Sequence, residues 1–468
     1  MTTLPDTLPA LSEALRSRRL TSVAVTEHYL ARCAALEEAV GSFLTIDRDG
    51  ALAAARAADA RLDAGRDVTP ITGIPLGVKD IIDVAGLRGT GHSPLYASRI
   101  PDRDAFVIAR LRAQGAVILG KTATNEFAIG AHGSDAIQPN PRNPWSARHA
   151  TGGSSSGSGT AVAAGEVPGA LGTDTGGSVR VPAAFNGITG LKTSRGLVSR
   201  SGVMPLSEGM DSVGPMARTT ACVALLLDAM VAVDPAESAQ RPADVPSYLE
   251  ASATLPQSWR LDRMTGFDAG LAPEYRSRLD QVEALLLGLG ATRFDSGFDG
   301  LEEMDAASAL IATAESWHLH RERLAATPGL YGRDARVRLH IGALISADDY
   351  LLAKQRAAAC SAQFAACLPG DDILMLPMNG GPAPANGPLD PATLGYGHWE
   401  HVGTNGWVNA LGAPALSLPC GLVDGRPVAV QLVSVAGRDA LLLAVARALE
   451  TALSEAGLAL PPLDAPRP

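Results

Sequence analysis

Segments typical of strands alternate with segments typical of helices along this chain. Residues 8–65 have apolar residues at helical spacing and a high alanine content, and Gly65 is a suitable end for the last helix. Beyond them, β-branched segments broken by glycine and proline, such as ITGIPLGVKDIIDVAG, are followed by helical ones, such as DAFVIARLRAQGAV. The alternation continues to the end, where APALSLPCG and PVAVQLVSV precede a helix. We therefore expect an α/β fold in a single domain over residues 1–468.

Composition and charge exclude several classes of protein. Hydrophobic residues make up 46% and charged residues 19% of the chain, as in globular proteins and unlike disordered ones. The net charge of -10 argues against a nucleic-acid partner, which would need a basic face. No segment has the apolar length of a transmembrane helix, and the N-terminus does not resemble a signal peptide. We therefore expect a soluble, cytoplasmic protein with no membrane partner.

The cysteine pattern argues against a disulfide framework and a metal site. The chain has five cysteines, an odd number, and they form no C-x-x-C pair. Such a pattern favours a reducing compartment and predicts no structural zinc.

Residues 115–122, GAVILGKT, match the P-loop pattern G-x-x-x-x-G-K-[ST]. A P-loop needs its four middle residues in a loop whose N–H groups surround a phosphate. Here those residues are Ala-Val-Ile-Leu, which favour a buried strand with N–H groups bonded within a sheet. We therefore interpret Lys121 as a strand residue and not as a phosphate ligand.

Residues 153–157, GSSSG, match the nucleophile elbow G-x-S-x-G with Ser155 as the nucleophile. An elbow directly follows a strand, whereas the preceding NPRNPWSARHATG has two prolines and no apolar run. An elbow serine also needs a histidine base, and the sequence selects none of its nine histidines. The elbow interpretation is therefore not favoured.

A third pattern combines two Ser/Gly-rich segments with an upstream lysine. GIPLGVKD covers residues 73–80, GGSSSGS residues 152–158 and GTDTGGSVRVP residues 172–182. A flexible linker is the alternative for the middle segment, but this segment leads directly into an alanine-rich helix. In the last segment Pro182 lies near the start of a predicted helix. The N–H groups of residues 175–178 would then lie at the helix N-terminus, where they suit an oxyanion.

Together these segments strongly resemble the amidase signature family, in the malonamidase-like variant with GGSSSGS. The resemblance runs from GIPLGVKDIIDVAG through RNPWSARHATGGSSSGSGTAVAAG and ALGTDTGGSVRVPAAFNGITGLKTSRGLVS to NALGAPALSLPCG and GRPVAVQLVS. The family places its two catalytic serines 24 residues apart, and Ser154 and Ser178 have this separation. The resemblance implies a mixed, mostly parallel twisted sheet of about ten strands between helix layers.

The resemblance also implies a Ser–cisSer–Lys triad that needs neither a metal nor a cofactor. Lys79 would be the base, Ser154 the bridging serine on a cis peptide bond, and Ser178 the nucleophile. The implied oxyanion hole consists of the backbone N–H groups of Thr175, Gly176, Gly177 and Ser178.

Other residues are implied to support or line this site. Ser155 would support the triad, and Asp174 and Arg180 are expected to brace the glycine loop; contact with a substrate carboxylate is the alternative for Arg180. The residues expected near the oxyanion loop, as part of the substrate pocket, are Phe127, Ala128 and Ile129. Phe127 suits the hydrophobic core equally well.

The resemblance divides the domain into four parts. Residues 1–65 are the N-terminal helices, and residues 66–232 are the catalytic core. Residues 235–400 are expected to form a variable helical region without a transferable motif. Residues 401–468 supply the strands and the helix that complete the core.

A lysine acts as a base only when it is neutral. Its ordinary pKa is about 10.4, so it must fall by roughly three, on the order of 4 kcal/mol, for a lysine to be neutral at pH 7. Burial can lower it that far, and Lys79 lies in the apolar sequence GVKDII. The alternative is an exposed lysine at a strand end, paired with Asp80.

The resemblance favours an amidase that hydrolyses the C–N bond of a small amide through an acyl-enzyme on Ser178. One alternative is the A subunit of an aminoacyl-tRNA amidotransferase, which would need partner subunits and an ammonia path. Another is an esterase or carbamate hydrolase with the same triad. A binding protein without activity is disfavoured because all three triad residues are present. The identity of the substrate and the formation of a homodimer stay open.

Overall fold

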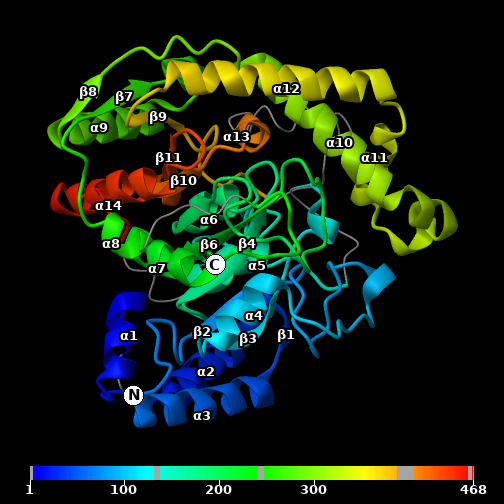
Figure 1. Cartoon of the computed structure of the whole chain (residues 1–468), viewed down its shortest axis with the longest axis vertical. Coiled ribbons are helices and arrows are strands. Elements are labelled where there is room, and N and C mark those ends of the chain that lie inside the picture. Colours follow the sequence, from blue (N-terminus) through cyan, green and yellow to red (C-terminus); the bar gives the residue numbers. More distant parts are fainter. Residues whose placement is uncertain (1–3, 131–136, 241–246, 387–404, 462–465, 467–468) are drawn as a thin grey trace.

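Eleven strands form one sheet in the computed structural model, which describes residues 4–130, 137–240, 247–386, 405–461 and 466 (Figure 1). In the order of the sheet they are β1 (Phe43–Ile46), β3 (Val117–Thr122), β2 (Pro75–Lys79), β4 (Gly169–Asp174), β6 (Ser212–Ala217), β5 (Thr189–Lys192), β10 (Ala415–Val423), β11 (Arg426–Val433), β9 (Asp372–Pro377), β7 (Trp259–Arg263) and β8 (Ala291–Arg293). The α/β class expected from the sequence is confirmed.

The sheet is mixed, as the resemblance implies. Its parallel pairs are β2·β3, β2·β4, β7·β8 and β7·β9. The other six pairs of neighbouring strands are antiparallel. The parallel share is therefore smaller than expected, in part because β10 and β11 are joined directly as a hairpin, a connection that only antiparallel strands allow.

Fourteen α-helices of the described residues surround the sheet. They are α1 (Leu8–Arg16), α2 (Ser22–Val40), α3 (Arg48–Ala64), α4 (Phe106–Ala113), α5 (Ser156–Ala163), α6 (Arg180–Asn186), α7 (Thr220–Met230), α8 (Tyr248–Ala251), α9 (Pro273–Gly288), α10 (Leu301–Ala326), α11 (Arg333–Gly342), α12 (Ala347–Cys367), α13 (Gly406–Leu411) and α14 (Asp439–Glu455). Helices α5 and α6 pack on the strands that carry the catalytic motifs, and α7, α8, α9 and α14 pack with one another as a second group. The end of α3 at Gly65 agrees with the sequence, because this glycine adopts a left-handed conformation with φ 60°.

The region expected to be helical, residues 235–400, also contains three strands of the sheet. Its helices α10, α11 and α12 pack together and lie at one end of the molecule (Figure 1). Its strands β7, β8 and β9 extend the sheet beyond β11. The alternating pattern of β7 is only five residues long, with Trp259 and Leu261 buried between polar residues, so its local strand signal is weak.

The parallel pair β2·β4 determines where the catalytic segments meet. Val78 of β2 is opposite Leu171 of β4 in the sheet. Both strands therefore end at the same edge, where Lys79 and Thr173 lie close together. The carboxyl ends of parallel strands are a common place for a site in an α/β sheet.

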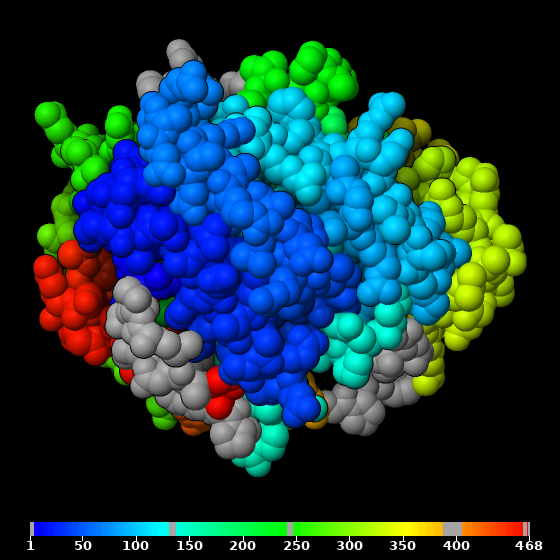
Figure 2. Space-filling model, turned by 90° about the horizontal axis from the view of Figure 1, so that it is seen from below, coloured from blue at the N-terminus to red at the C-terminus, as the bar shows by residue number. Residues whose placement is uncertain are grey.

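The main hydrophobic core lies between the sheet and its helices. It includes the buried Leu76, Leu171, Val213 and Leu416 of four different strands. Each fully buried aliphatic side chain of this kind contributes about 1.5–3 kcal/mol to folding. Seen from below, the N-terminal helices, in blue, form much of one face of the molecule (Figure 2). Within the described residues, none of the helices combines the length and the apolar character needed to cross a membrane.

Candidate active site

Lys79 is a fully buried lysine at the end of β2, with 0% of its surface exposed. Its Nζ lies 2.7 Å from Ser154 Oγ, 2.8 Å from Thr173 Oγ1 and 3.4 Å from the Thr173 carbonyl oxygen. Burial lowers the pKa of Lys79 to about 7, although the charges of Asp174 and Asp211 act in the opposite direction. Lys79 therefore has the burial that a neutral base at pH 7 requires.

Asp80 is not the partner of Lys79. Its carboxylate accepts hydrogen bonds from the backbone and side chain of Thr90, and its second oxygen lies 3.6 Å from Lys121 Nζ. Lys121 also donates to the carbonyl oxygens of Asp80 and Ile82, at 3.0 and 2.7 Å. Residues 117–122 form the buried strand β3, so the P-loop match is a strand sequence, as the sequence indicates.

Ser154 is buried beside Lys79, and its peptide bond to Gly153 is cis. The Ser154 carbonyl accepts the N–H of Asn125 at 3.1 Å, which holds the strand-exit segment after β3 against it. Gly153 must be small, because a Cβ atom there would lie 2.5 Å from Nδ2 of Asn125. The close packing of these residues fixes the backbone that carries the Ser154 hydroxyl.

Ser178 lies between β4 and α6 and is partly exposed, whereas Ser154 and Ser155 are buried. The N–H of Ser155 donates to the carbonyl of Ser178 at 3.2 Å, which joins the two Ser/Gly-rich segments. The Ser155 hydroxyl donates to the Thr173 carbonyl at 3.2 Å and accepts the Thr173 N–H at 3.3 Å. Ser155 thus directs its hydroxyl at the backbone of β4. Among the described residues no strand leads directly into it, unlike the serine of a nucleophile elbow.

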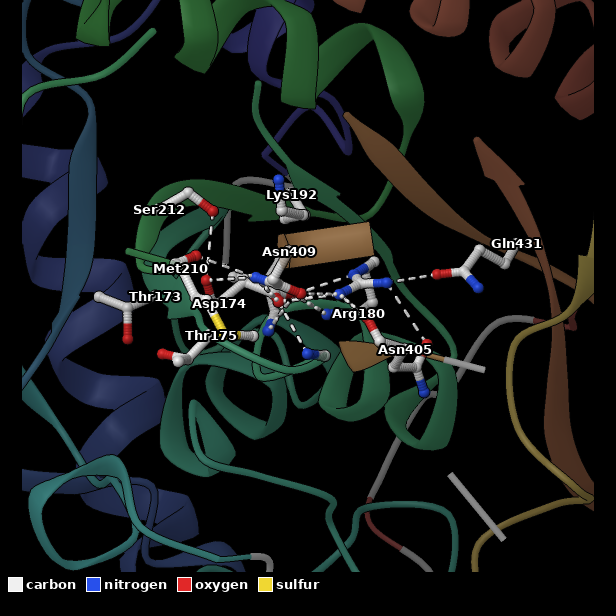
Figure 3. Close-up of polar contacts among 12 residues, drawn as sticks. Thr173, Asp174, Thr175, Arg180, Lys192, Met210, Ser212, Asn405, Asn409 and Gln431 are labelled. Carbon is white, nitrogen blue, oxygen red and sulfur yellow. Dashed lines mark hydrogen bonds and ion pairs between the residues drawn. The ribbon is translucent and has the colours of Figure 1, made fainter. Parts of the chain in front are cut away.

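Asp174 and Arg180 form a buried ion pair, 2.9 Å apart, next to the glycine loop (Figure 3). Burial alone would raise the pKa of Asp174, but the charge and hydrogen bonds of Arg180 hold it well below its usual range. The Arg180 guanidinium also donates to side-chain oxygens of Asn409 at 2.7 Å and Gln431 at 2.5 Å. It donates to the Asn405 carbonyl at 3.1 Å as well. These contacts favour bracing over contact with a substrate carboxylate.

Asp174 also uses one of the expected oxyanion donors. The Gly177 N–H donates to its carboxylate at 2.7 Å, so Gly177 is removed from the candidate oxyanion hole. For the N–H groups of Thr175, Gly176 and Ser178, the described part of the chain shows no acceptor. Thr175 directs its hydroxyl at Asp211, 2.5 Å away. Gly177 has φ 106°, in the left-handed region that favours glycine, and this turn directs its N–H at Asp174.

The expected pocket residues 127–129 are buried beside the Ser154 segment. Phe127 and Ala128 have positive φ angles of 51° and 61°, in a tight turn that follows Asn125. The Phe127 ring packs on Tyr96 and Tyr331, with ring centres 5.8 and 5.4 Å away. This aromatic contact places Phe127 in a hydrophobic cluster, and a substrate role for residues 127–129 stays a prediction.

Four residues of the site were missed by the sequence reasoning. They are Thr173, which contacts Lys79, and Asn405, Asn409 and Gln431, which contact Arg180. Thr173 immediately precedes Asp174 within the recognised motif, so its position was the available signal. No local pattern predicts the other three contacts, because the partners of Arg180 lie 225–251 residues away in the sequence.

Comparison with protein families gives a match along most of the chain. The family model Amidase matches residues 24–443. The chain is 36% identical over 477 residues to the A subunit of a glutamyl-tRNA(Gln) amidotransferase from Roseiflexus sp. (strain RS-1), with 95% of this chain and 96% of the relative covered. The similarity therefore extends along nearly the whole of both proteins.

Solved structures are also similar to this chain along nearly its whole length. A peptide amidase from Stenotrophomonas maltophilia superposes with a TM-score of 0.80 at 27% identity, covering 97% of this chain and 98% of that one. A 6-aminohexanoate cyclic dimer hydrolase superposes with a TM-score of 0.86 at 25% identity, covering 96% and 98%.

Proposed function

This chain belongs to the amidase signature family, whose enzymes act on the carbon–nitrogen bonds of amides, and we propose that it hydrolyses a small carboxylic amide through an acyl-enzyme on Ser178. The observation that carries the proposal is the 2.7 Å contact between Lys79 Nζ and Ser154 Oγ in a fully buried setting. Burial favours the neutral amine, and a neutral amine can accept the proton of a serine hydroxyl.

Acylation begins with two proton transfers. Neutral Lys79 takes the proton of Ser154, and Ser154 takes the proton of Ser178 as the Ser178 oxygen attacks the amide carbon. The N–H groups of Thr175, Gly176 and Ser178 stabilise the oxyanion, an effect often worth about 10²–10³ in rate for one donor. The C–N bond then breaks, and the proton returns through Ser154 to the leaving amine.

In deacylation water is the nucleophile, and the same groups transfer the protons. Water gives one proton to the same relay and attacks the ester carbon of the acyl-enzyme. The bond between the acyl group and Ser178 breaks, and Ser178 recovers its proton. The carboxylic acid leaves, and neither a metal nor a cofactor takes part.

Labelling with a fluorophosphonate, followed by peptide mapping, tests the nucleophile. We expect the label on Ser178 and a loss of amidase activity of at least about 1,000-fold in Ser178→Ala. Ser156→Ala is the matched control, because the Ser156 hydroxyl is buried in the same Ser/Gly-rich segment as Ser154, and no described residue forms a hydrogen bond with it. A label on Ser155, with Ser178→Ala still active, would falsify the assignment.

The 36% identity to the A subunit of an amidotransferase favours a second candidate function. A chain of that kind would act with partner subunits and transfer the ammonia it releases. The purified chain alone separates the two functions: an amidase hydrolyses simple amides without a partner, whereas one subunit of an amidotransferase needs its partners for full activity.

The bond specificity needs a direct comparison. An anilide, a carbamate and an ester with the same acyl group should be assayed with the wild-type chain and with Ser178→Ala. We expect the anilide to be cleaved in a Ser178-dependent reaction. Cleavage of the ester or the carbamate alone would instead indicate the esterase or carbamate hydrolase alternative.

A further inference from the structure

Thr173, the next-to-last residue of β4, is the other side chain in hydrogen-bond contact with Lys79. The proposed function uses only the Ser154 side of the amine. We infer that Thr173 is a positioning residue, which holds the Lys79 amine toward Ser154 and separates it from a cavity behind the triad. This inference rests on the proposed function of Lys79 as the base.

The hydrogen bonds of Lys79 show how Thr173 directs the amine. A neutral amine has two N–H donors and one lone pair. The Thr173 carbonyl oxygen, 3.4 Å from Nζ, can only accept, and the Thr173 hydroxyl, 2.8 Å away, can accept a second N–H. With both donors on Thr173, the lone pair is left for the proton of Ser154 Oγ, 2.7 Å away. Contacts from one residue therefore orient the base.

Ser155 fixes Thr173 in turn. Its hydroxyl accepts the Thr173 N–H at 3.3 Å and donates to the Thr173 carbonyl at 3.2 Å. The fit is close, because a Cβ atom on Gly172 would lie 2.7 Å from the Ser155 hydroxyl oxygen. Ser155 thus acts on Lys79 through the backbone of β4, which gives a physical reason for a hydroxyl at this position.

A cavity of about 340 Å³ lies behind this arrangement. Its wall includes Thr173, Thr175, Asp211 and Met204, and among the described residues that form the wall Lys79 does not occur. Thr173 therefore contacts both the Lys79 amine and the cavity. If water from the cavity reached the amine, it would stabilise the charged form and weaken the base.

The charged groups around Lys79 are few. Asp174, at the end of β4, and Asp211, in the loop before β6, are the two carboxylates that favour the charged amine. The neighbouring Asp80 on its own segment faces Thr90 and Lys121. Asp174 is paired with Arg180, which reduces its effect. Loss of the Thr173 hydroxyl alone and loss of both the hydroxyl and the methyl group should have distinct effects on the Lys79 amine.

Two substitutions separate these roles. Thr173→Val keeps the shape of the wall but removes the hydroxyl that accepts a hydrogen bond from the charged Lys79 amine. The acid limb of the profile of Ser178 labelling rate against pH should therefore move to lower pH. The substitution should also reduce kcat/KM about 10- to 100-fold, a part of the effect of a positioned base. Thr173→Ala opens the wall, so water should favour the charged amine and move the acid limb to higher pH.

Two further variants help to separate a positioning effect of Thr173 from a loss of folding. Thr173→Ser keeps the hydroxyl and should stay within about threefold of the wild type, with an unmoved acid limb. Ser155→Ala frees the backbone of Thr173 and should reduce kcat/KM about 3- to 10-fold, without a change of nucleophile. Thr189→Val is the matched control, because the buried Thr189 hydroxyl on β5 has no hydrogen-bond partner among the described residues.

The experiment measures the rate of fluorophosphonate labelling of Ser178 against pH for all five variants and the wild type, with thermal unfolding of each. Opposite shifts of the acid limb in Thr173→Val and Thr173→Ala, with rescue by Thr173→Ser, support the inference. If Thr173→Val does not fold, a shift of the acid limb to higher pH in Thr173→Ala, together with an unmoved acid limb in Thr173→Ser, supports the inference.

Unmoved acid limbs in Thr173→Val and Thr173→Ala, with Ser178 labelled normally in the wild type, overturn the inference and leave the proposed function intact. Failure of the wild type to label at Ser178 overturns both.

Discussion

Lys79 and Lys121 are neighbours in the sheet with different surroundings. Both side chains are fully buried, on the adjacent parallel strands β2 and β3. Lys121 contacts two carbonyl oxygens and the carboxylate of Asp80, whereas Lys79 contacts two hydroxyls and one carbonyl. Carbonyls and carboxylates only accept hydrogen bonds, but a hydroxyl can give its proton to a neutral amine. Burial lowers the pKa of both lysines, and the partners decide which one can act as a base.

Lysine is scarce in this chain. Only four lysines occur among 468 residues: Lys79, Lys121, Lys192 and Lys354. The first three are fully buried, and Lys354 is exposed. Since buried lysines are rare in proteins, each of the three needs a structural or a catalytic explanation.

The largest effect should come from removal of the base. Lys79→Met is expected to reduce kcat/KM about 10²–10⁴-fold, because no group is left to take the proton of Ser154. Lys79→Arg should be similarly inactive, because a guanidinium stays protonated. Steady-state kinetics with thermal unfolding as a control measures this effect. Activity above one tenth of the wild type in Lys79→Met would show that Lys79 is not the base.

The same substitution at Lys121 should instead affect folding. Lys121→Met leaves the buried carboxylate of Asp80 without its cation and should destabilise the protein by about 3–5 kcal/mol. The folded fraction should keep kcat/KM within about threefold of the wild type, since Lys121 does not contact the serines. Urea unfolding and kinetics on the same sample test this. An inactive but fully stable Lys121→Met would reverse the roles assigned to the two lysines.

Lys192 is a third buried lysine, with carbonyl partners like those of Lys121 but without an ion pair among the described residues. It donates to the carbonyls of Thr193 and Ala413, and no ion pair involves it within the described residues. Lys192→Met should therefore destabilise the fold by about 1–3 kcal/mol, through unsatisfied carbonyls alone. A loss of stability as large as in Lys121→Met would mean that nearby carboxylates, Asp174 or Asp439, depend on its charge.

For each single pH unit, the pH dependence of stability gives the smallest effect. The pKa of Lys79 is about 7 in the folded chain and near 10.4 when unfolded, so between these values the unfolded chain binds the extra proton. The wild type should therefore gain stability relative to Lys79→Met as pH rises from 7 to about 10, by up to about 1.4 kcal/mol per pH unit. Urea unfolding at several pH values measures the difference. A constant difference would indicate an ordinary pKa for Lys79.

Much of this fold and site follows from local sequence. The strand of Lys121 and the helix end at Gly65 were predicted because periodicity and turn residues act over short distances. The roles of Lys79, Ser154 and Ser178 were predicted from the resemblance to the amidase signature family. The apolar neighbours of Lys79 left a buried and an exposed lysine open, and the structure shows a buried one.

Other features depend on contacts between distant segments. The Gly177 N–H was expected to face an oxyanion, yet the carboxylate of Asp174 takes it, because Arg180 and Asn409 hold this carboxylate beside the loop. The strands of residues 235–400 were missed because their pairing with β11 and with each other comes from tertiary packing. Neither the hydrogen-bond partners of one N–H group nor the edge of a sheet is specified by local pattern.

The protonation state of Lys79 is the centre of this account, and the four lysines make it directly measurable. NMR of a chain with ¹³Cε-labelled lysine gives one signal set for each of the four residues, and the set lost in Lys79→Met is that of Lys79. We predict that this signal titrates with a midpoint near pH 7. A midpoint above about 9, close to the ordinary value for lysine, would contradict a neutral Lys79 base.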